Sequence, residues 1–560
     1  MYLRTTRRRT HDGSEVRYLA LAHNVWDPES RRSTVRILYN FGREDQLDRD
    51  AIRRLIGSLA RALPPAEALA AQAPELRFLE SRPVGGAWAL DRLWARLGID
   101  AICTQALRGR RLDPVAERAL FAMVVNRALA PASKLGCAAW VTEHVAIPGL
   151  AELSDDACYR AMDWLLEIEA ELATQVYWQV ATLLNLEVDL LFFDTTSTYF
   201  ETDAADPADP AAPDAPRGFR TFGHSKDHRP DLPQVVIGLA VTRTGIPIRV
   251  WTFPGNASDQ ELVRRVKDDL LAWKLARVVW VTDRGFNSSE NRRYLQRAGG
   301  HYITGEKLRG DSAEAQAALA RQGRYGRVAD NLEVKAVVLD DGVMRDRFVI
   351  CRNGDEAARD AAVRERLLAQ LEAAIDASDE RSAAERHELA CRLRGKPAYR
   401  RFLRVTTDGR LRIDRAAVTA EARLDGKFLL RTSDPTLSAA EVATGYKQLL
   451  EVERAWRDMK TTLDLRPVYH RKEERIRSHV LLCWLALLLV RIAENATGET
   501  WRVLRSELDK LHLGRFSGSS GEVRQRTEIT ARQAAIFKAL AVAEPPRFFE
   551  LAPARLAATA

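Results

Sequence analysis

Two apolar segments of this chain each end in an aspartate, a placement that could do chemistry. LLFFDTTSTYF, residues 190–200, contains Asp194, and VVWVTDRGF, residues 278–286, contains Asp283. Short runs rich in β-branched and aromatic residues are typical of strands in the core of a sheet. An ionised carboxylate at the end of a buried strand is costly unless a cation meets it. Turn capping is the alternative role, but the shared position favours a functional site.

A third acidic residue, Glu453, lies in a segment with helical periodicity. Apolar residues recur at helical spacing through YKQLLEVERAWRDMK, residues 446–460. Ser438 followed by Glu441 has the pattern of a capping box, so we expect one helix over 437–463. A glutamate on such a helix is usually a solvated charge, so Glu453 needs support from its neighbours.

Three carboxylates gathered at one place repel one another and need a divalent cation to compensate them. Oxygen ligands with room for water suit Mg²⁺, with Mn²⁺ as a substitute. Two such ions can stabilise both the attacking and the leaving oxygen at a phosphodiester. We therefore expect Asp194, Asp283 and Glu453 to form a catalytic, metal-binding triad for phosphoryl transfer.

The neighbours of Glu453 form a stripe along the predicted helix. Tyr446, Glu453 and Lys460 are seven residues apart, so they drift by only ~20° per step and share one face. Trp456 and Arg457 stand at i−4 and i−3 from Lys460, so that lysine has no acidic partner within the helix. We expect Tyr446 and Lys460 to contact phosphates on either side of the metal.

The elements between the two aspartates have a definite predicted order. QVVIGLAV and IPIRVWTF, joined through TRTG, predict a hairpin over 234–253. A helix near 258–273, the strand before Asp283, a helix at 287–298 and the strand HYIT follow. The order β-β-β-α-β-α-β is that of the ribonuclease H-like fold, whose first and fourth strands are neighbours. We therefore expect the sheet to bring Asp194 and Asp283 together.

The predicted fold class is α/β: a ribonuclease H-like catalytic core interrupted by a mostly β insertion, with an N-terminal β unit and a helical DNA-binding domain. Two Asp-Gly turns, Asp341-Gly342 and Asp408-Gly409, sit between strand-like runs and indicate hairpins in the insertion. The expected boundaries are a basic β unit at 1–48, the helical domain at 49–184, the core at 185–305 and 426–500, the insertion at 306–425, and a C-terminal helical tail at 501–560.

Charge favours a polyanionic partner. The chain has 560 residues, a net charge of +8 and a pI near 9.2. Residues 1–36 hold eight Arg against four carboxylates. A basic β-ribbon can read a DNA groove, although a solvated charged edge is the alternative.

Several other classes of protein are disfavoured. The six Cys are scattered without a CxxC, so neither a zinc ribbon nor a disulfide framework is indicated, and a reducing cytoplasm fits. The longest apolar run, Val480–Val490, is too short to span a bilayer and predicts a buried helix, so no membrane partner is expected. The sequence lacks a P-loop, so we expect no nucleotide cofactor.

A loop rich in cations supplies candidates for phosphate contact. GHSKDHRPD, residues 223–231, contains His224, Lys226 and Arg229. A site in which histidine and aspartate bind a metal is the alternative, but Lys226 and Arg229 would repel a metal and suit phosphate.

Two further segments could contact phosphate. RPVYHRKEERIRSHV, residues 466–480, places Arg466 and His470 in a basic stretch before the apolar helix. Ser133 is a predicted helix N-cap with Lys134 in the first turn, a place able to hold a phosphate, although an ordinary capped helix is the alternative.

These motifs resemble bacterial insertion-sequence transposases of the DDE type, in the branch marked by a Tyr-Arg-Glu-Lys signature. The signature runs Tyr, two residues, Arg, three residues, Glu, six residues, Lys. Tyr446, Glu453 and Lys460 match it, while Leu449 stands in place of Arg and puts one DNA contact in doubt. Further similarity lies in FGHSKDHRPDLPQVVIGLAV at 222–241, PGNASD at 254–259 and VTDRGFNS at 281–288.

The resemblance covers about residues 185–500 and implies that Asp194, Asp283 and Glu453 bind the metal, with Arg284 beside them on DNA. It implies an enzyme that binds element ends, hydrolyses a phosphodiester with metal-activated water and directs the 3′-OH at target DNA. We expect a homodimer on paired ends, acting on double-stranded DNA at the bacterial nucleoid. A stand-alone metal-dependent nuclease and a non-catalytic DNA-binding protein of transposase descent are the alternatives.

Overall fold

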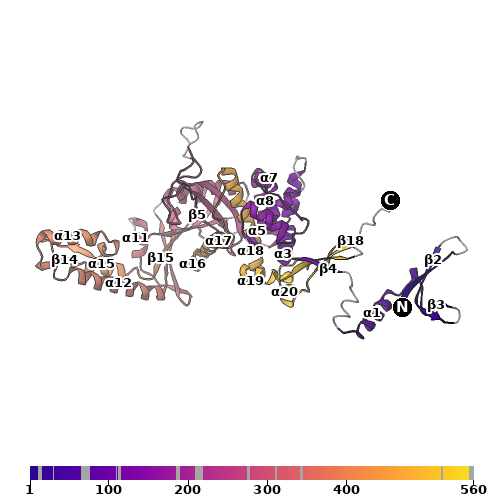
Figure 1. Cartoon of the computed structure of the whole chain (residues 1–560). Helices are drawn as coiled ribbons and strands as arrows, with labels where there is room; N and C mark the ends of the chain where they lie inside the picture. The colour runs from indigo at the N-terminus through magenta and orange to yellow at the C-terminus, as the bar shows by residue number, and fades with distance from the viewer. Residues whose placement is uncertain are drawn as a thin grey trace. The chain divides into compact units, whose positions relative to one another are not determined.

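The computed structural model describes most of the chain, which forms two compact units (Figure 1). The first comprises Met1–Glu80, Gly514–Gln525 and Phe548–Ala560, and the second comprises Ser81–Leu513 and Arg526–Arg547. The described residues are 1–9, 15–28, 31–64, 76–108, 110, 115–184, 190–207, 218–273, 278–309, 312–340, 345–518 and 521–553.

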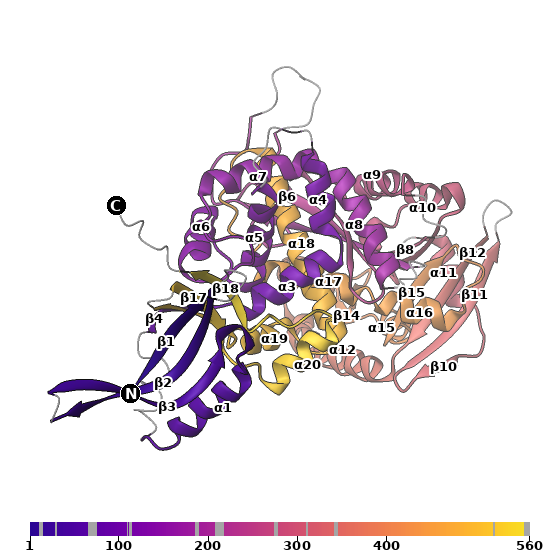
Figure 2. The ribbon, with the colours of Figure 1, turned by 90° about the vertical axis from the view of Figure 1, so that its right-hand side faces the viewer.

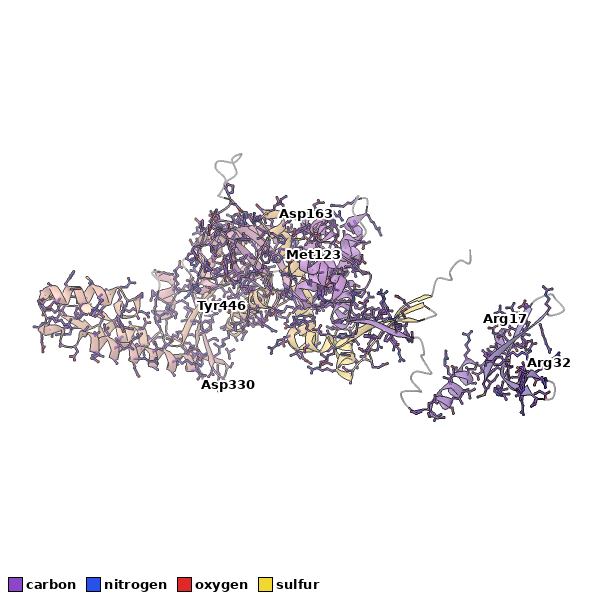
Figure 3. All side chains as sticks on the ribbon, viewed as in Figure 1. Arg17, Arg32, Met123, Asp163, Asp330 and Tyr446 are labelled. Atoms are coloured by element: carbon purple, nitrogen blue, oxygen red, sulfur yellow. The ribbon has the colours of Figure 1, made fainter. Side chains whose placement is uncertain are left out.

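The first unit contains the antiparallel sheet β1-β2-β3, formed by Tyr2–Arg9, Glu15–Asp27 and Arg32–Arg43. The strands predicted near the N-terminus are therefore confirmed. Helix α1, Arg49–Ala60, follows, and the Asp48 side chain accepts hydrogen bonds from two backbone N–H groups of its first turn. Arg17 on β2 and Arg32 on β3 are exposed (Figure 3), so this sheet carries cations at its surface.

The segment 501–560 is not the helical tail that we expected. It contains helices α19 and α20 but also strands β16, β17 and β18, which pair with β4 in the order β18-β17-β16-β4. Strand β4 also interrupts the segment 49–184, which we expected to be helical throughout. These short strands carry little local signal because their partners are distant in sequence; Ser81 and His512 hydrogen-bond across 431 positions. The bounds are Arg77–Pro83 for β4, Trp501–Leu508 for α19, His512–Gly518 for β16, Gly521–Arg526 for β17, Ala531–Ala539 for α20 and Phe548–Pro553 for β18.

A nine-stranded sheet organises the second unit, in the order β10-β11-β12-β15-β9-β8-β5-β6-β7. Strands β5, β6 and β7 are antiparallel neighbours, and β8 and β9 run parallel to β5. The predicted succession of strands and helices is confirmed, and β5 and β8 are adjacent as expected. The bounds are Leu190–Tyr199 for β5, Gln234–Val241 for β6, Pro247–Pro254 for β7, Asp259–Leu271 for α9, Val279–Thr282 for β8, Ser289–Gln296 for α10 and His301–Glu306 for β9.

The segment 437–463 forms two helices rather than the single predicted helix. The capping box of Ser438 and Glu441 is present at the start of α16, Ala439–Lys447. The chain then turns, and the N–H of Leu449 bonds three residues back, to the Tyr446 carbonyl, at 3.0 Å. Leu449 is buried, so packing rather than helix propensity sets the break, and α17 begins at Leu450 and ends at Thr461.

Helices α16, α17 and α18 pack on the sheet. Helix α17 contacts β5 and β6, α18 (Glu473–Thr497) contacts β7, and α16 contacts β8 and β9. A Cβ at Gly445 of α16 would lie 2.9 Å from Leu190 Cδ1, so glycine permits this close approach to β5.

A helical cluster surrounds α18, which contacts α5 and α7 (Figure 2). Met123 of α5 is buried in this cluster (Figure 3). Helix α18 is long and apolar enough to cross a membrane by length and composition, but its apolar stretch is 94% buried within the protein, which confirms the predicted buried helix. The bounds are Gly85–Arg96 for α3, Ile99–Leu107 for α4, Ala116–Leu129 for α5, Lys134–Glu143 for α6, Asp155–Glu167 for α7 and Glu169–Leu183 for α8.

The insertion at 306–425 is helix-rich, so the expectation of a mostly β insertion is wrong. Its strands β10, β11 and β12 extend the central sheet through β15, and the remainder folds around its own core, which includes Leu371, Leu393 and Phe402. The sequence does predict helix over about 355–395, where Val363, Leu367, Leu371 and Ile375 recur on one stripe, and α12 and α13 confirm it, whereas it does not predict the shorter helices α11, α14 and α15. The hairpin at Asp408-Gly409 is confirmed, whereas Asp341-Gly342 lies outside the described residues. The bounds are Ala313–Ala320 for α11, Gly326–Ala329 for β10, Leu332–Asp340 for β11, Arg345–Arg352 for β12, Gly354–Ile375 for α12, Ala383–Arg394 for α13, Pro397–Arg400 for α14, Leu403–Val405 for β13, Leu411–Ile413 for β14, Arg415–Ala422 for α15 and Lys427–Thr432 for β15.

Candidate active site

The register of two parallel strands sets Asp194 beside Asp283. Strands β5 and β8 pair from Leu190 with Val279 to Phe193 with Thr282. The next residue along each strand is one of the two aspartates. Both are therefore at the same level of the sheet. Asp283 follows the carboxyl end of β8, whereas Asp194 lies within β5, which continues to Tyr199, so the expectation that Asp194 ends its strand is wrong.

Asp194 is in a strained electrostatic setting. Its side chain is 22% exposed. Burial raises the pKa of Asp194 to about 6, and the nearby carboxylates of Asp259 and Asp283 add to that rise, while the Lys226 ammonium opposes it. A cation at this place would relieve the crowding of negative charge.

Lys226 already supplies one positive charge there. Its ammonium donates to the Thr195 carbonyl at 2.8 Å and to Thr195 Oγ1 at 2.6 Å. It lies 3.8 Å from Asp194 Oδ1 and 3.5 Å from Asp259 Oδ2. Lys226, a predicted phosphate contact, is thus a neighbour of the carboxylates.

Our sequence reasoning missed Asp259. This residue begins α9, and its Oδ1 accepts a hydrogen bond from Thr195 Oγ1 at 2.6 Å. The phrase PGNASD contained the signal, but an aspartate at a helix start is commonly a charge near the helix dipole. Only the fold brings it to β5.

Tyr446 contacts the second aspartate directly. Its hydroxyl donates to Asp283 Oδ1 at 3.2 Å, and burial together with Asp283 raises the pKa of Tyr446. A Cβ at Gly305 of β9 would lie 2.5 Å from the Tyr446 hydroxyl oxygen. Glycine therefore makes room for the tyrosine, which is labelled in Figure 3.

Glu453 lies in the first turn of α17 and is exposed. Its charge adds to the rise in the pKa of Tyr446, so it faces the same region. Within the part of the chain that the structure describes, no group of three His, Cys, Asp or Glu side chains is close enough to hold a metal ion. The strands bring Asp194 and Asp283 to the same level of the sheet, and together with Glu453 they do not form such a group.

The donor set nevertheless fits a hard divalent cation. Asp194, Asp259 and Asp283 offer carboxylate oxygens, which are the ligands that Mg²⁺ prefers. Burial is the main cause of the raised pKa of Asp194, and the carboxylates of Asp259 and Asp283 add to it although Lys226 opposes them.

The stripe of Tyr446, Glu453 and Lys460 is not a continuous helix face, because Tyr446 belongs to α16 and the others to α17. The expectation of an unpaired Lys460 is also wrong. Its ammonium donates to Asp227 Oδ1 at 2.8 Å, and Arg466 Nη1 lies 2.9 Å from Asp227 Oδ2. Because Asp227 is 233 positions away, a rule limited to i−3 and i−4 could not find it.

The remaining predicted DNA contacts have different environments. Arg229 pairs with Asp231 at 2.8 Å, and both Arg229 and Arg466 lie 5.3 Å from the Tyr199 ring centroid. His224 and Arg284 are exposed. His470 packs against Tyr159 and His479 instead, with ring centroids 6.2 and 5.7 Å away.

Comparison with protein families gives two matches. Residues 217–489 match the transposase DDE domain, and residues 3–70 match the N-terminal domain of the IS1634 family of transposases. Comparison with curated proteins gives no match.

Among solved structures, a piggyBac transposase synaptic complex with hairpin DNA is similar at 10% identity and a TM-score of 0.36, covering 77% of this chain and 82% of that one. A superposition at this level carries no argument about the site. The two family matches, together with the paired aspartates of β5 and β8, identify the chain as an insertion-sequence transposase of the DDE type.

Proposed function

We propose that Asp194, Asp283 and Glu453 bind Mg²⁺, with Mn²⁺ as a substitute, and that the transposase uses them to cleave and join DNA at the ends of its element. The observation that carries this proposal is the parallel register of β5 and β8, which puts two carboxylates at one level. Divalent ions, when bound, would stabilise the attacking and leaving oxygens of the phosphodiester.

The strand order supports a ribonuclease H-like core. Strands β7, β6 and β5 are antiparallel, and β8 and β9 continue the sheet in parallel to β5. This is the arrangement expected from the sequence, in which the first and fourth strands place acidic residues side by side.

The side chains of the site have separable roles. Tyr446 holds Asp283 through its hydrogen bond, and such outer partners orient metal ligands. Lys226 balances charge between Asp194 and Asp259. The exposed Arg284 and His224 face solvent and are available to DNA phosphates.

Other parts of the chain are assigned to DNA binding and assembly. We assign the cationic sheet β1-β2-β3 and the helical region at 49–184 to contact with the element ends. Paired ends require two active sites, so we assign a homodimer in the bacterial cytoplasm, acting on nucleoid DNA.

The test uses the full chain and duplex DNA carrying the termini that flank its own coding sequence. With Mg²⁺ we expect strand cleavage at the termini and, with two ends present, a paired-end complex that joins the 3′-OH to a target plasmid. Cleavage without joining or pairing would favour a stand-alone nuclease, and binding without cleavage would favour a non-catalytic protein.

A further inference from the structure

A second polar cavity lies in the helical region, where the start of α6 meets the segment before α18. Its volume is about 230 Å³, and its lining includes Arg127, Ser133, Lys134, Tyr159, Asp464, His470 and His479. The metal ligands proposed above are not among its lining residues.

The cavity contains buried cationic groups without partners. Lys134 is 4% exposed, and no described residue forms a hydrogen bond or ion pair with its ammonium. Arg127 donates through Nη1 to the Asp464 carbonyl at 3.0 Å, but its buried Nε has no partner in the described part of the chain. The buried His479 is not one of these cations, because burial lowers its pKa and its Nε2 donates to the Leu465 carbonyl at 2.9 Å, which leaves Nδ1 unprotonated.

Asp464 is the one carboxylate among the lining residues, and in the described part of the chain its side chain forms no ion pair with Lys134 or Arg127. The thiols of Cys137, Cys158 and Cys483 are the groups that favour the charge of Lys134, and the Asp464 side chain is exposed. Burial and the neighbouring Arg127 lower the pKa of Lys134 to about 8. A buried charge that lacks an opposite charge is costly, so the site is suited to an anion.

The backbone adds a second source of attraction. Helix α6 has ten residues, and the Ser133 hydroxyl accepts only from the Gly136 N–H, at 3.0 Å. The N–H groups of Lys134 and Leu135 therefore have no partner among the described residues. Free N–H groups and the positive end of the dipole at a helix start favour an anion.

We propose that this cavity binds one phosphate group of the DNA backbone. Its volume is below the range of roughly 300–1,000 Å³ typical of pockets for larger small molecules, which suits a single tetrahedral anion. The inference rests on the proposed function only in taking DNA as the partner.

An adjoining hollow indicates how a strand reaches the cavity. It has a volume of about 740 Å³, is lined by Arg220, Arg466 and Arg471, and shares Pro467, Tyr469 and His470 with the cavity. Arg220 pairs with Asp206 and Arg466 with Asp227, and Glu201 also lines the hollow. A nucleic-acid backbone seated in the cavity can continue through this hollow past Arg471, whereas a free phosphate needs no such extension.

The test compares Lys134→Met with Lys538→Met, a matched loss of one charge at an exposed position on α20. Duplex DNA binding is measured without divalent metal over a salt series, so failure of the cleavage proposal does not affect the outcome. Loss of one phosphate contact should reduce the slope of log affinity against log salt by ~0.9 and weaken binding by about tenfold. Lys538→Met should leave both unchanged.

Methylphosphonate substitution then locates the contact. Neutralising one particular phosphate should weaken the wild type but not Lys134→Met. Thermal unfolding of Lys134→Met should occur at an equal or higher temperature, because a buried uncompensated charge is removed. Unchanged slope and affinity would overturn the proposal, as would affinity loss accompanied by lower stability.

Experiments with inorganic phosphate distinguish a DNA backbone phosphate from a free phosphate ion as the group that the cavity binds. Stabilisation of the wild type by inorganic phosphate, combined with an unchanged DNA salt slope in Lys134→Met, would make the cavity a free-anion site and would overturn the assignment to DNA. If inorganic phosphate competes with DNA for the wild type but not for Lys134→Met, that result would support the assignment to DNA.

Discussion

The Tyr446 hydroxyl donates to Asp283 Oδ1 at 3.2 Å and so ties helix α16 to the end of strand β8. The tyrosine is 163 positions from the aspartate, and it fits only because Gly305 of β9 leaves space for its hydroxyl. One hydrogen bond thereby fixes the orientation of a carboxylate that we assign to the metal.

Tyr446→Phe should lower metal-dependent cleavage by about 10–100-fold, the usual loss when an outer partner of a metal ligand is removed. The mechanism is loss of orientation of Asp283, so a higher Mg²⁺ concentration should restore part of the activity. Single-turnover cleavage across a Mg²⁺ titration measures this. A full rate at every Mg²⁺ concentration would remove Tyr446 from the site.

Gly305→Ala should destabilise the fold, because its Cβ would lie 2.5 Å from the Tyr446 hydroxyl oxygen. The overpacking cost is roughly 1–3 kcal/mol. In the Tyr446→Phe background the oxygen is absent, so the cost should shrink. Urea unfolding of both single variants and the double variant measures this coupling; additive costs would contradict the close contact.

Asp194→Asn, Asp283→Asn and Glu453→Gln should each abolish strand cleavage while duplex binding remains, because each change removes a proposed metal ligand and no proposed phosphate contact. Ca²⁺ tolerates loose geometry and should support binding with little cleavage. Binding and cleavage of the same labelled end DNA are measured together. A variant that still cleaves with Mg²⁺ would lose its place in the triad. The test matters most for Glu453, which lies on α17 and not on the paired strands.

Sequence patterns predicted the strands and helix starts that depend on residues close together in the chain. The apolar runs before Asp194 and Asp283 gave the strands, and the capping box at Ser438 gave the start of α16. The break at Leu449 was not predictable, since leucine is a good helix former and only its burial against the fold stops the ladder. The same limit hid Asp259 and the short helices α11, α14 and α15 of the insertion.

Lys460→Met should leave the DNA salt slope nearly unchanged, because Lys460 is paired with Asp227 at 2.8 Å rather than facing solvent. Its side chain is 14% exposed and that of Asp227 is 10% exposed. Breaking the pair should destabilise the protein by about 1–3 kcal/mol, with Arg466 retaining part of the charge balance.

A double-mutant cycle with Asp227→Asn checks the origin of that loss. The losses in the free energy of unfolding, measured with urea, should be less than additive in the double variant, because each change removes the same contact. Additive costs combined with a shallower salt slope would instead return Lys460 to the DNA surface.

Stability in mild acid should depend on His470. Burial is the largest cause that lowers the pKa of His470 to about 4, and the charges of Lys134, Arg475 and Arg127 lower it further. Between pH 6.5 and 4 the unfolded chain therefore binds a proton that the folded chain refuses, so this contribution to stability falls as pH falls. His479, which is buried beside it, acts in the same direction.

Lys134→Met removes one of the charges that disfavour protonated His470, so its loss of stability between pH 6.5 and 4.5 should be smaller than that of the wild type. The pKa of Asp194 is raised to about 6, so this group makes the folded state more stable as pH falls, which is the opposite of the effect of His470. For that reason the pH dependence of stability is compared between variants and is not interpreted for the wild type alone. Urea midpoints at several pH values for wild type, Lys134→Met and the surface control Lys538→Met give the measurement. Parallel curves for all three would show that Lys134 and His470 do not share the cavity, and would weaken the case for a phosphate held between them.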